Sequence, residues 1–302
     1  MPSSYHKRKI NATPSGEESR AGGALARLEI AGGVVTLRAS TAYGRCAPTV
    51  RISAEEYLIK ATGEIVQMRH GAKRTDNAQA LKRSMERLRG YVNANFGGGP
   101  DAAKSQAWIT LTYRENVRDT RRVQEDWEAW IRWYRRRIGA EVEYITAIEP
   151  QARGAWHLHA LVKRTDGGEI YVPHSELLAA WRKVAARKTP AKVLEGGKTA
   201  GGLHVHALEG IDNLGAYLSS YLCDDDGKKG ARLHLYPTGL HYYRCSKGIK
   251  VPEVKEYTTV SAAREAAKAI TGQAAHWEEA YEVVDEEGTR VMAGIIEQYK
   301  RR

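Results

Sequence analysis

The segment VEYITAIEPQARGAWHLHALVK, residues 142–163, contains two apolar stretches joined by a short polar connection. The stretches at residues 142–149 and 155–163 are rich in β-branched, aromatic and other apolar residues, which is typical of strands. The connection is too short for a crossover helix, so the two strands must pair antiparallel as a hairpin. We therefore expect this hairpin to lie in an antiparallel sheet.

Strands and helices alternate on both sides of this hairpin, which favours an α+β fold in which helices cover one face of the sheet. Asp212 is a typical N-cap residue, so we expect a helix to begin there. The expected strands are residues 34–38, 57–68 with an interrupting turn, 108–113, 203–208 and a run near 240–245, and the other expected helices are residues 76–95, 119–138, 175–186 and 262–270.

The second strand of the hairpin carries two histidines that flank one leucine, in the run GAWHLHALV. Side chains at positions i and i+2 of a strand project from the same face, with α-carbons about 6.6 Å apart. His157 and His159 therefore point together, and Leu158 points to the opposite face. In isolation, such a pair is more often two partly buried histidines bonded to backbone or water, so further residues must decide.

Glu149 ends the preceding strand, across the turn from the histidines. If the hairpin pairs Glu149 near His157 or His159, its carboxylate joins the two imidazoles on one face. Two nitrogen donors and one oxygen donor, with positions left open, suit a catalytic rather than a structural ion. The set is compatible with Mg²⁺ or Mn²⁺, and imidazole favours Mn²⁺.

Two tyrosines in the run NLGAYLSSYLC share one face of an expected helix, because Tyr217 and Tyr221 are four residues apart. Tyrosines at this spacing are usually half-buried packing residues. Beside a metal site they allow a second interpretation. A phenol, with a pKa of about 10, becomes an effective nucleophile when a metal polarises the phosphate that it attacks, and the product is a phosphotyrosine.

Composition and cysteine use restrict the class of protein. A formal net charge of +11 favours a polyanionic partner, because Lys and Arg release counterions when they neutralise phosphates. Cys46, Cys223 and Cys245 lack the close spacing of zinc and redox motifs, which indicates a reducing cytoplasm. The sequence contains neither an apolar run of membrane-spanning length nor a Walker-type phosphate loop, so we expect neither a membrane-spanning helix nor a fused nucleotide-driven motor.

Three motifs together resemble, in order and spacing, those of the HUH endonucleases, in which two histidines flank a hydrophobic residue. They are WITLTY, GAWHLHALV with the preceding Glu149, and YLSSY. The chain is most similar to the rolling-circle replication initiators, or Rep proteins, of bacterial plasmids and phages. GYVNANF before WITLTY and HYYRCSKGI after the tyrosines also resemble the flanks of that family, so the resemblance covers about residues 76–250.

The resemblance implies a ferredoxin-like or RRM-like nuclease core whose central antiparallel sheet carries the histidines. It implies that His157, His159 and Glu149 hold a divalent ion, Mn²⁺ or Mg²⁺. Tyr217 or Tyr221 would attack the scissile phosphate at an origin, remain on the 5′ end and free a 3′-OH for a polymerase. The second tyrosine could make the later cut or the rejoining.

One residue departs from the family's pattern. Family members often carry a lysine three residues after the first tyrosine, and Ser220 stands at that place in this chain. A charge that would orient the phosphate is therefore missing there or comes from elsewhere, for example from Lys228 or Lys229.

The resemblance also suggests domain limits, partners and alternatives. We expect a basic N-terminal extension with short strands at residues 1–75, the nuclease domain at 76–250 and a C-terminal extension at 251–302. The expected partners are single-stranded or cruciform origin DNA, a host helicase and a DNA polymerase, in the cytoplasm of a bacterial host. The alternatives are a relaxase or single-strand transposase of the HUH class, or a non-catalytic basic nucleic-acid-binding protein. Tyr5 precedes the histidines, as in relaxases, but lies in a polar tail, so chain order favours the Rep proteins.

Two further groups of residues are candidates for binding. His204 and His206, in LHVHAL, form a second histidine pair on an expected strand, but they lack an acidic hairpin partner upstream and are the weaker ligand candidates. Basic side chains around the expected site could track a DNA strand, or could simply form a solvated surface. The candidate DNA-binding residues are Lys73, Arg74, Lys82, Arg83, Arg87, Lys228 and Lys229.

Overall fold

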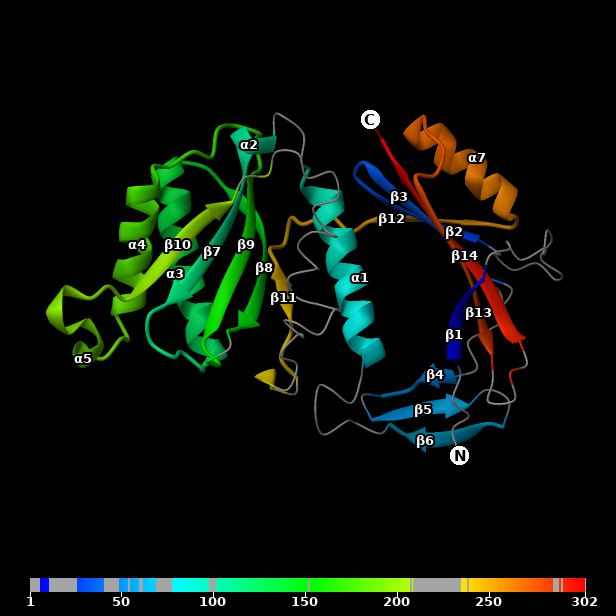
Figure 1. The fold of residues 1–302 in the computed structure, drawn as a ribbon, viewed down its shortest axis with the longest axis horizontal. Coiled ribbons are helices and arrows are strands. Elements are labelled where there is room, and N and C mark those ends of the chain that lie inside the picture. The colour runs from blue at the N-terminus through cyan, green and yellow to red at the C-terminus, as the bar shows by residue number, and fades with distance from the viewer. Residues whose placement is uncertain are drawn as a thin grey trace. The chain divides into compact units, whose positions relative to one another are not determined.

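The chain folds into two compact units. The first is formed by Met1–Gly71 together with Val251–Arg302, and the second by Ala72–Lys250. Figure 1 shows the ribbon of this computed structural model. It describes residues 6–10, 26–40, 49–53, 55–59, 62–68, 78–97, 102–151, 153–206, 208, 235–237, 239–284, 288 and 290–301.

A five-stranded antiparallel sheet forms the centre of the second unit, and this confirms the predicted α+β fold. All four pairs of neighbouring strands run antiparallel, including the pair formed by the segment 142–163. Across the sheet, the strands lie in the order β10 (Gly201–His206), β7 (Gln106–Tyr113), β9 (Trp156–Arg164), β8 (Val142–Pro150) and β11 (Tyr243–Cys245).

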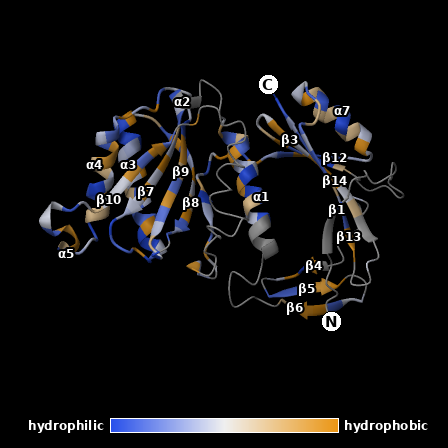
Figure 2. Cartoon of the chain, viewed as in Figure 1, coloured by the Kyte–Doolittle hydropathy of each residue, from blue (hydrophilic) through white to orange (hydrophobic). Residues whose placement is uncertain are grey.

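One face of this sheet is covered by two long helices, α3 (Thr120–Ile138) and α4 (His174–Ala186) (Figure 1). The side chain of Asp119 caps the start of α3 by accepting a hydrogen bond from the backbone N–H of Arg121. Hydrophobic residues, coloured orange in Figure 2, recur along β7 and β9 beneath these helices. The buried residues of α3 are Val123, Asp126, Trp127, Trp130, Ile131 and Tyr134.

The opposite face also carries a helix, α1 (Ala78–Asn95), so the expectation that helices cover a single face is wrong. The reason lies in the strands, since Trp108, Ile145 and Leu161 are buried on this second face and need a cover. The ammonium of Lys163, on the same face as Leu161, donates to Oδ1 of Asn95 in α1 over 3.1 Å.

Within the described ranges, no helix combines the length and the hydropathy that a membrane crossing requires. The remaining short helices of this unit are α2 (Ala102–Ser105), α5 (Ala191–Leu194) and η2 (Glu195–Gly197).

The first unit combines residues from both ends of the chain. Its six-stranded antiparallel sheet has one helix, α7 (Val260–Thr271), packed on it through Ala263 and Ala267. A separate three-stranded sheet contains β4 (Thr49–Arg51), β5 (Glu56–Ile59) and β6 (Glu64–Gln67). The larger sheet has the order β1 (His6–Ile10), β13 (Trp277–Val284), β14 (Arg290–Lys300), β3 (Val34–Ser40), β2 (Ala26–Ala31) and β12 (Glu253–Tyr257).

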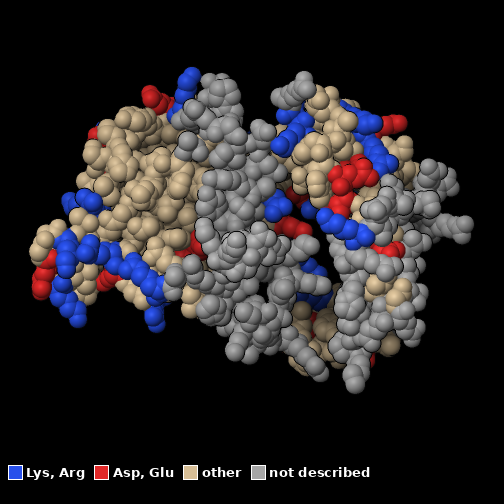
Figure 3. Space-filling model, viewed as in Figure 1, with Lys and Arg blue, Asp and Glu red and all other residues tan. Residues whose placement is uncertain are grey.

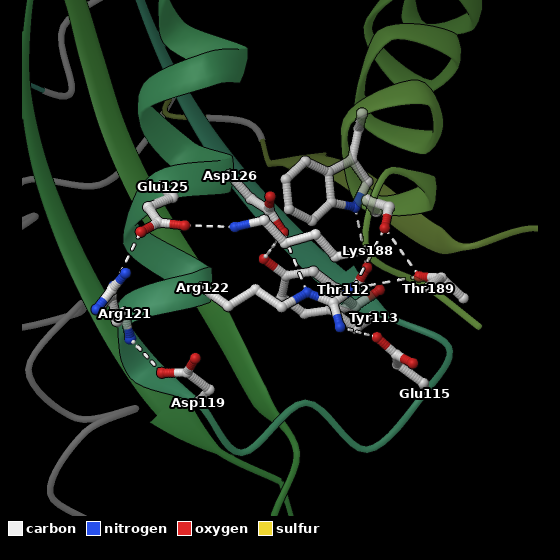
Figure 4. Close-up of polar contacts among 12 residues, drawn as sticks. Thr112, Tyr113, Glu115, Asp119, Arg121, Arg122, Glu125, Asp126, Lys188 and Thr189 are labelled. Carbon is white, nitrogen blue, oxygen red and sulfur yellow. Dashed lines mark hydrogen bonds and ion pairs between the residues drawn. The ribbon is translucent and has the colours of Figure 1, made fainter.

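A largely buried ionic network centred on the half-buried Arg122 ties the end of β7 to α3 and α4 (Figure 4). The Arg122 guanidinium pairs with Glu115 and with Asp126, and it donates to Oγ1 of Thr189 over 3.2 Å. The hydroxyl of Tyr113 donates to the same Asp126 carboxylate over 3.0 Å. The network therefore fixes the end of strand β7 and the loop that follows it.

We expect Arg122→Met to lower the free energy of unfolding by about 3 kcal/mol, because the buried carboxylate of Asp126 and the half-buried one of Glu115 then lose their cationic partner. The matched control is Arg121→Met at the preceding position of α3, where the side chain is 86% exposed and pairs only with Glu125 among the described residues. The free energies of unfolding of the two variants are compared by urea unfolding monitored through tryptophan fluorescence. Equal destabilisation by both would contradict the role assigned to the network.

Candidate metal centre

Three side chains on strands β8 and β9 converge at one end of the sheet. Oε2 of Glu149 lies 3.1 Å from Nε2 of His157 and 3.3 Å from Nε2 of His159. One ligand atom from each residue lies within 4.8 Å of the other two. No other group of three His, Cys, Asp or Glu side chains in the described part of the chain meets this condition.

The strand register brings these three residues together. Glu149 stands directly opposite His157, and Ala147 stands opposite His159. Residues that face each other across an antiparallel pair project from the same side of the sheet, and so do positions i and i+2 of one strand. The turn requires Gly154, whose φ of 80° lies in the left-handed region that favours glycine.

The local environment sets the charge of the three groups. Burial alone would raise the pKa of the Glu149 carboxyl, but hydrogen bonds from His157 and His159 outweigh it and lower that pKa to about 2. Burial lowers the pKa of His159, against the opposing effect of its bond to Glu149. Near neutral pH the carboxylate is therefore ionised and His159 is neutral, which are the forms that bind a metal ion.

The chemistry of this donor set fits a divalent cation. Glu149, His157 and His159 offer one carboxylate oxygen and two imidazole nitrogens from rigid, paired strands, with the two ring centres 4.7 Å apart. Three protein ligands leave positions for water or for substrate oxygens, as catalytic metal sites require. The structure therefore contains a possible metal-binding triad made of the three predicted residues.

Two residues that sequence analysis missed contact the far side of these imidazoles. Oγ1 of Thr110 lies 3.0 Å from Nδ1 of His159, and Nε2 of Gln151 lies 3.4 Å from Nδ1 of His157. Thr110 looks like any polar residue of an alternating strand in WITLTY, and its contact follows only from the pairing of β7 with β9. These partners restrict the orientation of both rings.

The second histidine pair lies on the same face of the sheet as the triad. His204, on the edge strand β10, stands opposite Thr110 on β7, which in turn stands opposite His159 on β9. Nε2 of His206 lies 2.8 Å from Oγ1 of Thr110, and the His206 ring stacks on Trp108 with centroids 4.5 Å apart. His206 is therefore linked to His159 through one hydroxyl group.

Exposed arginines surround the turn between Glu149 and His157. Arg153, in this turn, donates to the backbone oxygens of Arg114 over 2.7 Å and of Tyr113 over 2.6 Å. Arg114 and Arg118 are also exposed and lie on the loop after β7. Lys and Arg side chains are visible along an edge of this unit in Figure 3. The position of the turn makes these arginines candidates for contact with a bound anion.

The other predicted site residues fall into two groups. Arg83 and Arg87 are exposed on α1, which also contains Lys82. Seven predicted residues lie outside the described residues. They include both candidate nucleophiles, the residue at which a helix was expected to begin, and the remaining candidate DNA-binding residues. These are Tyr217, Tyr221, Asp212, Lys73, Arg74, Lys228 and Lys229.

A comparison with protein families gives one match, to the replication-associated protein ORF2/G2P, over residues 106–226. The matched residues include β7, the β8–β9 hairpin and the segment with Tyr217 and Tyr221, and they make up less than half of the chain. No curated protein and no solved structure matches the chain. The match associates this part of the chain with replication proteins and is consistent with a Rep-type protein.

The triad predicts a loss of metal affinity when its carboxylate is neutralised. We expect Glu149→Gln to weaken Mn²⁺ binding more than about 100-fold, beyond what the loss of an outer partner usually costs. Isothermal titration calorimetry measures this, with Glu141→Gln as the matched control on the exposed residue that precedes β8. Unchanged affinity in Glu149→Gln would exclude the carboxylate as a ligand.

Proposed function

We propose that the chain is a rolling-circle replication initiator that nicks and rejoins single-stranded DNA at its origin. The observation that carries this proposal is the convergence of Glu149, His157 and His159 on one sheet face within the segment that matches a replication-associated family. A hairpin whose ionised carboxylate and two imidazoles can hold one divalent ion, with other coordination positions left for phosphate oxygens, is suited to phosphate chemistry. On this proposal, residues 76–250 form the catalytic domain, and the two segments that extend the chain beyond it together form the other compact unit.

The proposed reaction transfers a phosphoryl group to tyrosine. The phenol oxygen of Tyr217 or Tyr221 forms a bond to phosphorus, and the bond from phosphorus to the 3′ oxygen breaks. The phenol proton passes to water, and the leaving oxygen takes up a proton to become the 3′-OH that a polymerase extends. When a free 3′-OH later attacks the phosphotyrosine, the phosphodiester is restored and the tyrosine is released.

In this scheme, the side chains of the triad hold and orient the metal. Glu149, His157 and His159 would bind Mn²⁺ or Mg²⁺, with Mn²⁺ favoured by the two imidazoles. The ion, when bound, supplies Lewis acidity that withdraws charge from the scissile phosphate. The strands that carry the ligands are paired along their length, so the ligands need little rearrangement on binding.

Arginines beside the triad could supply the positive charge that the family's lysine would provide at the position of Ser220. Because no lysine stands at that position, we propose that Arg153 and Arg118 contribute the positive charge near the phosphate. Arg153 belongs to the turn that joins Glu149 to His157, so a backbone phosphate bound to an ion held by the triad would lie next to this turn. Arg83 and Arg87 on α1 are proposed to contact DNA further along the strand. A host helicase would open the duplex.

The test uses labelled single-stranded DNA from the origin of the chain's own replicon, with Mn²⁺, Mg²⁺ or EDTA. We expect a covalent DNA–protein adduct with either metal and none with EDTA, and mass spectrometry should place it on Tyr217 or Tyr221. Phenylalanine at the attacking position should lower adduct formation at least about 1,000-fold, as loss of a nucleophile does.

The matched control is Tyr171→Phe, at a tyrosine that is 72% exposed. An adduct that persists in the Tyr217→Phe, Tyr221→Phe double variant would reject these nucleophiles. DNA binding without any adduct, on a verified origin with metal present, would reject the nickase and favour a non-catalytic DNA-binding protein.

A further inference from the structure

One hydroxyl group joins the candidate metal centre to the second histidine pair. Oγ1 of Thr110 lies 3.0 Å from Nδ1 of His159 and 2.8 Å from Nε2 of His206. Thr110 is buried at 7% exposure and His159 at 6%, so neither can exchange this contact freely for one with bulk water. The contact therefore restricts the orientation of the His159 ring.

Strand pairing explains how the three residues meet. Thr110 lies on β7 between two neighbours, opposite His159 on β9 and opposite His204 on β10. His206 is two residues further along β10, so it is the diagonal neighbour of Thr110 on the same face. Its ring is held on the Trp108 indole, with an interplanar angle of 27°, and its Nε2 reaches the threonine hydroxyl.

The hydrogen-bonding capacities of these groups fix a consistent proton arrangement for a metal-loaded site. The Nε2 atoms of His157 and His159 face Glu149, so these nitrogens are the ligand atoms. A neutral imidazole that binds metal through Nε2 carries its proton on Nδ1, and His159 then donates to Oγ1 of Thr110. The threonine hydroxyl keeps its own hydrogen for donation to Nε2 of His206.

We propose that Thr110 and His206 are positioning residues that orient His159 for metal binding. The proposal rests on the metal role given to the triad in the proposed function. Ligating histidines commonly donate their second ring N–H to an outer partner, and the loss of such a partner typically costs about 10- to 100-fold in metal affinity. Here the outer partner is a hydroxyl, and the edge strand supplies a second acceptor behind it.

The test is Mn²⁺ titration of the full chain by calorimetry, without DNA. Thr110→Val keeps the shape of the side chain and removes the hydroxyl, so we expect about 10- to 100-fold weaker binding. Thr110→Ser restores the hydroxyl and should bring the affinity to within about threefold of the unaltered chain. Melting curves of each variant show whether it is folded.

A second pair of variants tests the edge strand. His206→Phe retains a ring to stack on Trp108 but loses the acceptor, and we expect about 10-fold weaker Mn²⁺ binding. His206→Gln can place an amide group near the former Nε2 and should recover most of the affinity. The matched control is Val205→Phe on the exposed adjacent position of β10, which should bind Mn²⁺ like the unaltered chain.

The outcomes separate this proposal from the proposed function. Folded Thr110→Val with unchanged Mn²⁺ affinity would overturn the positioning role, whether or not the chain nicks DNA. Weakened binding that serine restores would support it, even if no DNA adduct forms. Absence of Mn²⁺ binding in the unaltered chain would overturn the metal centre and the positioning role together.

Discussion

Glu149 stands opposite His157 in the β8–β9 ladder, and the candidate metal centre depends on this pairing. Side chains alternate between the two faces of a strand, so a shift of one residue would turn Glu149 away from both imidazoles. The short turn, in which Gly154 adopts a left-handed conformation, and the long paired strands oppose such a shift. The same register supplies the hydrogen bonds by which both imidazoles lower the pKa of the Glu149 carboxyl.

The rest of the second unit keeps this hairpin in place. Helices α3 and α4 cover one face of the sheet, and α1 covers the apolar part of the face that carries the triad. The Arg122 network holds the end of β7 and its loop against the two helices. Strand β7 then presents Thr110 to His159, so packing far from the triad affects the orientation of its most buried imidazole.

Local sequence signals predicted the hairpin, most helices and the triad, because they depend on alternation, turn length and capping. Other features depend on pairing between distant segments. Thr110 could not be singled out without knowing that β7 lies between β9 and β10, and His206 gained its partner only through that order. The packing of α1 on a second apolar face also depends on contacts between segments that are distant in the sequence. The same holds for the single sheet that is built from both chain ends. The tyrosines, outside the described residues, remain a prediction of the sequence.

The central claim is that one divalent ion binds between the two strands of the hairpin. Crystals of the full chain grown with Mn²⁺ would test it through the anomalous scattering of manganese. The account predicts a strong peak bonded to Oε2 of Glu149 and to Nε2 of His157 and His159, and no such peak in crystals of Glu149→Gln. A manganese peak at other side chains, with this triad empty at saturating Mn²⁺, would contradict it.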